Sequence, residues 1–379
     1  MTASDEAARR VPLSTVLREW GRIGCIGFGG PPTHIALLRE LCVERRQWLE
    51  ASEFEDAVAA CNLLPGPAST QLAIFSAWRV AGVPGALAGG AAFIVPGLVL
   101  ILGLAAIFLA GSPPDWIRGA GAGAGAAVAA VAVQAGLGLV PASWRRTSSQ
   151  PRWLVYLVSG GVAAAMLGPW LVLVLLGCGA LELGLQRRAL TWPLAASAPA
   201  TGGLLALTWT AFKVGALSFG GGFVIVPLMR ADAVDHHHWL TRAQFLNAVA
   251  LGQITPGPVV QTVAVVGYAA AGLAGGILAS VVAFTPSFSF VLLGAGQFDR
   301  LRGDRRARAF LGGAGPAAIG AILGSAIPLT RALEQPWQYA VLAAALVLML
   351  ALRRGVVFTL LAAGAAGTFI ALAGGPLPH

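Results

Sequence analysis

Long runs without a charged side chain constrain the fold of this chain more than any other feature of its sequence. A helix that crosses the hydrocarbon core of a bilayer needs about 20 predominantly apolar residues. The mean hydropathy of +0.76 also lies well outside the range of water-soluble domains. The sequence therefore predicts an all-α polytopic membrane protein. The uncharged runs are 80–114, 119–144, 153–181, 243–298, 309–330, 335–352 and 355–378.

The net charge of +9 does not by itself indicate a nucleic-acid partner, because the basic residues lie in short segments between the apolar runs. Such a distribution is typical of membrane topology signals. The four cysteines have no metal-binding spacing, and no HExxH, P-loop or GxSxG motif occurs. We therefore expect neither an enzyme nor a protein that needs a metal or another cofactor.

The chain contains an internal repeat with an offset of 191 residues, which becomes 190 after a one-residue gap. It predicts a first repeat at 1–188, a linker at 189–202 and a second repeat at 203–379. The matched positions are Phe28-Gly29-Gly30 with Phe219-Gly220-Gly221, Pro65-Gly66-Pro67 with Pro256-Gly257-Pro258, Arg22 with Lys213, Arg39 with Arg230, Gly82 with Gly272, and Pro96 with Pro286.

The charges between the apolar runs alternate in opposite phase in the two halves. In the first half, 111–118 is neutral, 141–152 carries three arginines, the turn near Pro169 is neutral and 187–188 is a pair of arginines. In the second half, 299–308 has five arginines against two aspartates, 331–335 is neutral, 353–354 is a pair of arginines and the C-terminal tail has no Lys or Arg. Positively charged loops stay in the cytoplasm. The pattern therefore predicts two inverted-topology repeats, with the C-terminus outside.

Two motifs in each half predict interrupted helices. Only 16 residues separate Arg22 from Arg39, and Lys213 from Arg230. That is about 24 Å of helix, which is short for a hydrocarbon core of about 30 Å. Each segment also contains Phe-Gly-Gly, and each half has Pro-Gly-Pro inside an apolar run, where proline disrupts a helix. We expect broken or re-entrant helices at both motifs and about five to six membrane helices in each half.

The glycine motifs are candidate anion sites, because backbone N–H groups at a turn beside a helix N-terminus can bind an anion. A cation precedes each motif by six residues: Arg22 before Phe28, Gly29 and Gly30, and Lys213 before Phe219, Gly220 and Gly221. Charged residues inside a membrane are functional by default. Close packing of helices through glycine, and snorkelling of Arg22 to the interface, remain alternatives.

The proline motifs are surrounded by neutral hydrogen-bonding side chains. These groups can replace part of the hydration shell of an anion, or they can satisfy the interrupted backbone themselves, and the sequence does not decide between the two. The candidate substrate-binding residues in and beside these motifs are Asn62, Pro65, Gly66, Pro67 and Gln71 in the first half, and Ser218, Gln253, Pro256, Gly257, Pro258 and Gln261 in the second, with Ser69, Thr70, Thr255 and Thr262 nearby.

The segments 27-GFGGPPTHIALLRE-40, 63-LLPGPASTQL-72, 212-FKVGALSFGGGFVIVPLMR-230 and 247-NAVALGQITPGP-258 resemble the CHR family of chromate ion transporters, in its long form with both repeats in one chain. The resemblance covers nearly the whole chain. It implies a multi-pass protein of the bacterial inner membrane that exports chromate and gives chromate resistance. It assigns importance to Phe28, Gly29, Gly30, Pro31, Pro65, Gly66 and Pro67, and to Phe219, Gly220, Gly221, Pro256, Gly257 and Pro258. The roles of Arg22 and Lys213 rest on the repeat alone.

Three other functions compete with chromate export. Sulfate is also a tetrahedral dianion, so a carrier for sulfate or another oxyanion fits the same features. A membrane-embedded enzyme would need paired carboxylates or a histidine cluster in the long apolar runs, which have none. A scaffold would not need broken helices in both halves. The expected partners are a small oxyanion and membrane lipid, with a homodimer left open.

Overall fold

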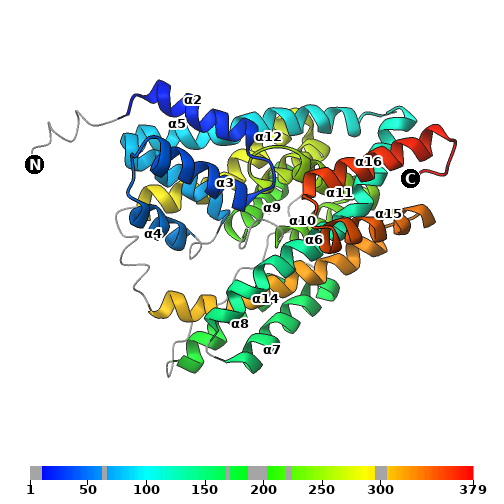
Figure 1. Ribbon diagram of the computed structural model, residues 1–379. Helices are drawn as coiled ribbons and strands as arrows, with labels where there is room; N and C mark the ends of the chain where they lie inside the picture. Colours follow the sequence, from blue (N-terminus) through cyan, green and yellow to red (C-terminus); the bar gives the residue numbers. More distant parts are fainter. Residues whose placement is uncertain are drawn as a thin grey trace, which may run out of the picture.

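The computed structural model describes residues 11–61, 66–111, 113–147, 149–167, 171–186, 203–218, 224–294 and 305–378. Every regular element in these ranges is helical, so the predicted all-α class is confirmed (Figure 1). The first half contains α2 (Leu13–Ile26), α3 (Pro31–Arg39) with the π-helix η1 (Glu40–Arg45), α4 (Ala51–Cys61), α5 (Ala68–Phe108), α6 (Asp115–Arg146), α7 (Gln150–Val162) with the π-helix η2 (Ala163–Leu167), and α8 (Leu171–Gln186).

The second half repeats this order of elements, including its irregularities. The π-helix after α3 has its equivalent after α10, and each is followed by a residue with positive φ, Gln47 at 51° and His238 at 52°. The elements are α9 (Leu204–Ala216), α10 (Ile225–Arg230) with η4 (Ala231–His236), α11 (Arg242–Ile254), η5 (Val259–Gln261), α12 (Thr262–Gly294), α14 (Arg305–Arg331), α15 (Pro336–Leu346) with η7 (Val347–Ala351), and α16 (Val356–Leu372).

Both α5 and α12 fold back on themselves, which the sequence did not predict. In α5, Ala81 and Gly82 have non-helical dihedral angles, and a Cβ atom placed on Gly89 would lie 2.4 Å from the Cβ of Ala77. A straight helix would separate these two residues by about 18 Å. The chain therefore reverses at Gly82, whose φ of 66° is readily accessible to glycine. The second half has the same reversal at Gly272, with φ 61°.

The two halves are intertwined rather than side by side. Helix α6 of the first half packs on α15 and α16 of the second, while α14 of the second half packs on α7 and α8 of the first. The equivalent helices α5 and α12 also contact each other. Glycines allow the close approach: a Cβ on Gly119 would lie 2.4 Å from the carbonyl oxygen of Gly367.

Contacts between helices fix their relative directions. Gly320 lies against Leu157 and Gly324 against Gly161, so α14 runs in the same direction as α7. Near the end of α6, Ser143 accepts a hydrogen bond from Trp153 near the start of α7, and Figure 1 shows α7 running in the direction opposite to α6. Since α6 is antiparallel to α7, the equivalent helices α6 and α14 run in opposite directions.

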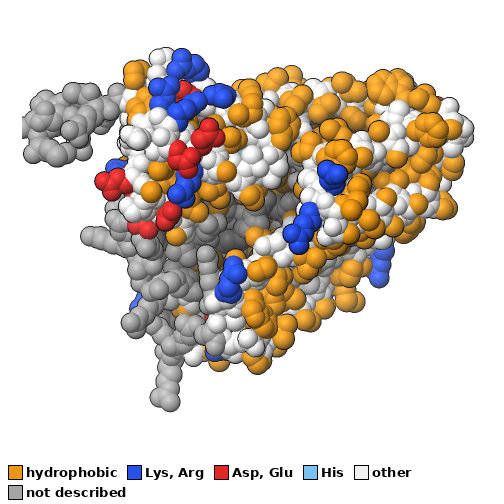
Figure 2. Space-filling view, viewed as in Figure 1, with side chains coloured by type: hydrophobic (Ala, Val, Ile, Leu, Met, Phe, Trp, Pro, Cys, Tyr) orange, Lys and Arg blue, Asp and Glu red, His pale blue; other side chains and the backbone are white. Residues whose placement is uncertain are grey.

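Among the described residues, four helices are long and apolar enough to cross a membrane: Ala68–Phe108, Asp115–Arg145, Val259–Gly294 and Ala309–Arg331. Shorter apolar helices accompany them in both halves. Large apolar side chains are exposed on the surface, including Val99, Met166 and Phe369, and Figure 2 shows wide areas with few charges. Such a surface is unusual in a soluble protein and fits contact with lipid. The structure therefore supports a multi-pass membrane protein.

Candidate functional site

The first Phe-Gly-Gly motif forms a turn between two helices. Helix α2 ends at Ile26 and α3 begins at Pro31, and the turn has φ of 97° at Gly29 and 78° at Gly30. Helix α3 begins with two prolines, which have no N–H group. The backbone donors that the turn offers to a ligand are therefore those of Gly29, Gly30 and Thr33.

This turn contacts the Pro-Gly-Pro motif of the other half. The N–H of Gly257 donates a hydrogen bond of 3.0 Å to the carbonyl oxygen of Gly27. A Cβ on Gly97, in the long arm of α5, would lie 2.2 Å from the carbonyl oxygen of Pro256. The side chain of Gln261 donates a hydrogen bond to the Ile94 carbonyl. We call this contact between the 27–30 turn, 94–97 and 256–261 the first junction.

A second junction repeats the arrangement with the halves exchanged. A Cβ on Gly66 would lie 3.4 Å from the carbonyl oxygen of Gly215 in α9 and 3.3 Å from the Oγ of Ser287 in α12. Residue 215 is the repeat equivalent of Gly24, and a Cβ on Gly257 would lie 3.9 Å from the Gly24 oxygen. Gly257 therefore lies against α2 and α5 of the first half, and Gly66 against the equivalent helices α9 and α12 of the second half.

Several buried polar atoms in and beside the repeated motifs have no partner among the described residues, and two of them, Gln261 Oε1 and Ser287 Oγ, lie at the first and the second junction. They are Thr70 Oγ1, Ser218 Oγ, Gln253 Nε2, Gln261 Oε1 and Ser287 Oγ, and Trp209 Nε1 is the additional case away from the motifs. Leaving such an atom unsatisfied costs about 1–3 kcal/mol. Hydroxyl and amide groups left unsatisfied at two equivalent places are candidates for contacts with a polar ligand. The side chain of Gln71 is fully buried here as well and has an interaction partner.

Sequence reasoning missed two residues of the site. His34 is fully buried, with Nε2 2.8 Å from the Gly27 carbonyl oxygen and Nδ1 3.2 Å from Ser69 Oγ. The donation from Nε2–H to Gly27 leaves Nδ1 to accept a hydrogen bond from the Ser69 hydroxyl. Ser287 was also missed, although it follows the repeated Pro96 and Pro286 by one residue. The repeat itself could have identified it, whereas His34 has no equivalent in the second half, where Ile225 takes its place.

The two predicted cations lie in different surroundings. Lys213 Nζ is 2.6 Å from Asp232 Oδ2, which also accepts a hydrogen bond of 2.8 Å from Thr210. The Asp232 residue is 5% exposed, so this lysine neutralises a buried carboxylate. Arg22 is exposed on α2, and no ion pair of Arg22 occurs within the described ranges. The structure does not bring Arg22 and Lys213 together in one described pocket.

The first half has its own buried carboxylate, at a different position. Glu19 is 6% exposed and pairs with Arg45 at 2.5 Å and Arg46 at 2.7 Å. Its repeat equivalent is Thr210, which hydrogen-bonds to Asp232. Both halves therefore tie their first helix to the following π-helix region by a buried charge, although the acidic residue has moved from the first helix to the π-helix.

The remaining predicted residues fall into three groups. Phe28 is 41% exposed at the first turn. Pro67 precedes α5, and Pro256 and Pro258 flank Gly257 between α11 and η5. Five predicted residues lie outside the described residues: Asn62, Pro65, Phe219, Gly220 and Gly221.

Comparison with known proteins decides the family. The family model named Chromate transporter matches residues 14–183 and 205–368, one match in each half. The chain belongs to the chromate transporter family. The family model thus matches this chain twice, once in each predicted repeat. The repeat boundaries at 188 and 203 stay a prediction.

Relatives of this chromate transporter family member cover most of its length. A chromate transport protein of Cupriavidus metallidurans is 32% identical over 334 residues, which are 82% of this chain and 80% of the relative. A probable chromate transport protein of Synechococcus elongatus is 30% identical over 335 residues, 82% of each chain. A chromate transport protein of Pseudomonas aeruginosa is 27% identical over 384 residues, 92% of this chain and 90% of the relative. No solved structure matches.

Proposed function

We propose that this chain is a secondary transporter that exports chromate from the bacterial cytoplasm across the inner membrane, and so gives chromate resistance. The observation that carries this proposal is the pair of equivalent junctions, each made by both halves and each containing buried polar groups without a partner among the described residues. A tetrahedral oxyanion accepts hydrogen bonds in several directions. Neutral hydroxyls, amides and the N–H groups of Gly29 and Gly30 can supply them.

The energetics favour export of a dianion. One charge moved through 100 mV is worth about 2.3 kcal/mol, so an inside-negative potential of that size favours the exit of a dianion by about 4.6 kcal/mol. Membrane voltage alone can therefore drive the export of a doubly charged oxyanion.

We further propose that the two repeats have inverted topology. The opposite directions of α6 and α14 support this, together with the opposite phase of the loop charges. Alternating access then follows if one half rocks against the other around the junctions. Such motion would make and break the Gly257–Gly27 hydrogen bond at the first junction and the contacts of Gly66 with Gly215 and Ser287 at the second.

Chromate uptake into inverted membrane vesicles tests the function, because export in the cell becomes uptake there. We expect saturable uptake that depends on the chain and on an imposed voltage, and unlabelled sulfate measures how well the protein separates the two dianions. If vesicles with the protein take up no more chromate than vesicles without it, the proposed function is wrong. If sulfate is taken up in preference to chromate, the protein is a sulfate carrier.

Ser287→Ala tests the location of the substrate site in the same assay. The hydroxyl of Ser287 has no partner in the described residues, so its loss should leave the fold intact. It should raise the KM for chromate roughly tenfold, since a hydrogen bond to a charged group is worth about 1.5–3 kcal/mol. Thr285→Ala is the matched control, because Thr285 is exposed on the same helix and bonds its own helix at Val281. An unchanged KM in Ser287→Ala and in Thr70→Ala would remove the junctions as the site.

A further inference from the structure

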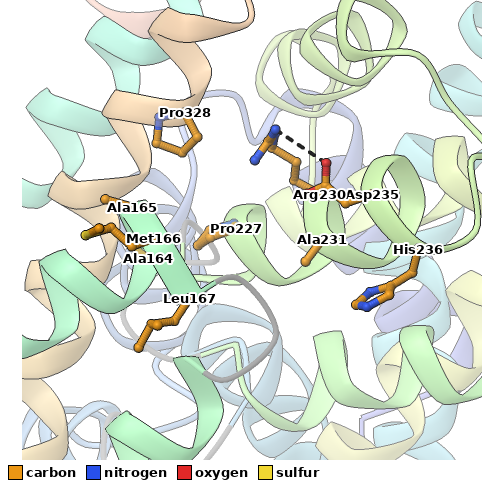
Figure 3. Close-up of a pocket in the computed structure, with 10 residues that line it drawn as sticks. All are labelled: Ala164, Ala165, Met166, Leu167, Pro227, Arg230, Ala231, Asp235, His236 and Pro328. Atoms are coloured by element: carbon orange, nitrogen blue, oxygen red, sulfur yellow. Dashed lines mark ion pairs between the residues drawn. The ribbon is translucent and has the colours of Figure 1, made fainter.

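A pocket of about 440 Å³ lies between the two halves and shares no residue with either junction (Figure 3). The first half contributes the π-helix η2, which follows α7, including Met166 and Leu167. The second half contributes Pro227 and Arg230 of α10, His236 of η4 and Pro328 of α14. The volume is in the range of small-molecule sites, about 300–1,000 Å³.

Within the described residues, the guanidinium group of Arg230 has one carboxylate partner, Asp235. Its Nη2 atom is 3.5 Å from Asp235 Oδ1, which is longer than the 2.6 Å of the Lys213–Asp232 pair. Figure 3 shows the other terminal nitrogen turned away from Asp235, toward the side of the pocket where Pro227 and Pro328 lie. Since arginine has five N–H donors, one carboxylate at this distance leaves donors available to a ligand.

Comparison with the equivalent arginine of the first half shows what has changed. Arg39 is 45% exposed and contacts two carboxylates, Glu44 at 3.5 Å and Glu55 at 3.2 Å. Arg230 keeps the first partner as Asp235, but Leu246 occupies the position of Glu55. Arg230 is also less exposed, at 22%. Arg230 is thus less exposed than Arg39, has a leucine at the position of the second acidic partner of Arg39, and lines a pocket.

We infer that this pocket binds a small oxyanion through Arg230, as a second site separate from the junctions. Arginine recognises tetrahedral oxyanions through paired N–H donors, and partial burial strengthens these charge-assisted hydrogen bonds. The pocket lies at η2 and near the end of α14, which precede the neutral segments near Pro169 and at 331–335. In the proposed topology these segments face outward, so the site lies at the outer mouth. This location rests on the proposed function, whereas oxyanion binding to Arg230 does not.

Equilibrium dialysis of the purified full chain with radiolabelled sulfate tests the binding. Arg230→Gln should raise the Kd of one class of sulfate sites by roughly ten- to a hundredfold, which corresponds to the loss of a hydrogen bond to a charged group. Arg230→Lys should lose less affinity for sulfate, because it keeps the positive charge. This conservative variant also controls for a folding defect in Arg230→Gln. Asp235→Asn should strengthen binding, since it removes a competing negative charge. Arg39→Gln, the repeat-matched control, should bind sulfate as the wild type does. Wild-type sulfate binding in Arg230→Gln would overturn the inference.

A transport measurement separates this inference from the proposed function. The lumen of inverted vesicles corresponds to the outside of the cell, so sulfate loaded there should reduce chromate uptake by the wild type and much less by Arg230→Gln. If chromate is transported and luminal sulfate acts equally on both proteins, the outer site is wrong and the transport function stands. If no chromate is transported but sulfate binding still depends on Arg230, the function is wrong and the binding site stands.

Discussion

The N–H group of Gly257 donates a hydrogen bond of 3.0 Å to the carbonyl oxygen of Gly27, which joins the Pro-Gly-Pro motif of one half to the Phe-Gly-Gly motif of the other. The same carbonyl accepts a hydrogen bond of 2.8 Å from His34. A single backbone oxygen therefore links three segments of the chain. At the first junction, two motifs that look independent in the sequence are therefore parts of one contact between the halves.

Gly97→Ala should damage the first junction. The new Cβ would lie 2.2 Å from the Pro256 carbonyl oxygen, so either the long arm of α5 or the Pro-Gly-Pro segment must move. Overpacking of this kind typically costs about 1–3 kcal/mol. We expect a lower midpoint of thermal unfolding in detergent and reduced chromate uptake. Gly103→Ala is the control on the same arm, because its Cβ would meet nothing within 4 Å. Equal behaviour of the two variants would contradict the packing described for the junction.

The Lys213–Asp232 pair allows two roles of the lysine to be separated. Lys213→Ala leaves Asp232 buried without its cation, and breaking a buried pair costs about 3–5 kcal/mol. If the lysine serves mainly to neutralise Asp232, the double variant Lys213→Ala with Asp232→Asn should recover both stability and transport. If it is a substrate ligand, stability should recover while the KM for chromate stays high. Thermal unfolding and uptake kinetics of the two single variants and the double variant distinguish these outcomes.

The sequence predicted the membrane class, the helical fold and the repeat, because hydropathy and self-similarity report directly on these properties. It also identified Pro65-Gly66-Pro67 and Pro256-Gly257-Pro258 as special, without indicating that Gly66 and Gly257 lie against the opposite half. Such contacts depend on how α5 and α12 fold back at Gly82 and Gly272. Both glycines were matched in the repeat, yet a glycine in an apolar run does not show whether it packs or turns.

The charged residues were harder to interpret. Lys213 and Asp232 are 19 positions apart in sequence, and nothing in the local pattern indicates that they pair. Arg22 and Lys213 occupy equivalent positions in the repeat and are both cations, but they do not have equivalent ionic partners. The first repeat buries Glu19 and the second buries Asp232, so each cation was left with a different environment.

His34 should be a positioning residue of the first junction. It connects Gly27 to Ser69 and lies edge-on against the ring of Phe93, with ring centroids 5.0 Å apart. His34→Ala removes both hydrogen bonds and leaves a cavity, so the free energy of unfolding should fall by about 2–4 kcal/mol. The midpoint of thermal unfolding should fall accordingly. His34→Gln keeps hydrogen-bonding groups and should recover part of this loss. Ser69→Ala removes one contact and should have the smallest effect. If His34→Ala unfolds at the wild-type temperature, the contacts of His34 with Gly27 and Ser69 do not stabilise the first junction.

Accessibility of single cysteines should decide the topology of the repeats. The residues chosen are Thr147, which follows α6, and Arg331, which ends the equivalent helix α14. In a variant with Cys25, Cys42, Cys61 and Cys178 replaced, Thr147→Cys should react with a membrane-impermeant maleimide only from the cytoplasmic side. Arg331→Cys should react only from the outside, because the three arginines of 141–152 hold the first loop in the cytoplasm while 331–335 is neutral.

Two glycines provide internal controls for this experiment. Gly111 and Gly355 are exposed, and a Cβ on either would meet nothing within 4 Å, so cysteine can replace each without a steric clash. Gly111→Cys should label from the outside with Arg331→Cys, and Gly355→Cys from the cytoplasm with Thr147→Cys. If Thr147→Cys and Arg331→Cys label from the same side, the repeats are parallel. The opposite directions of α6 and α14 would then require that one of these two helices does not cross the membrane.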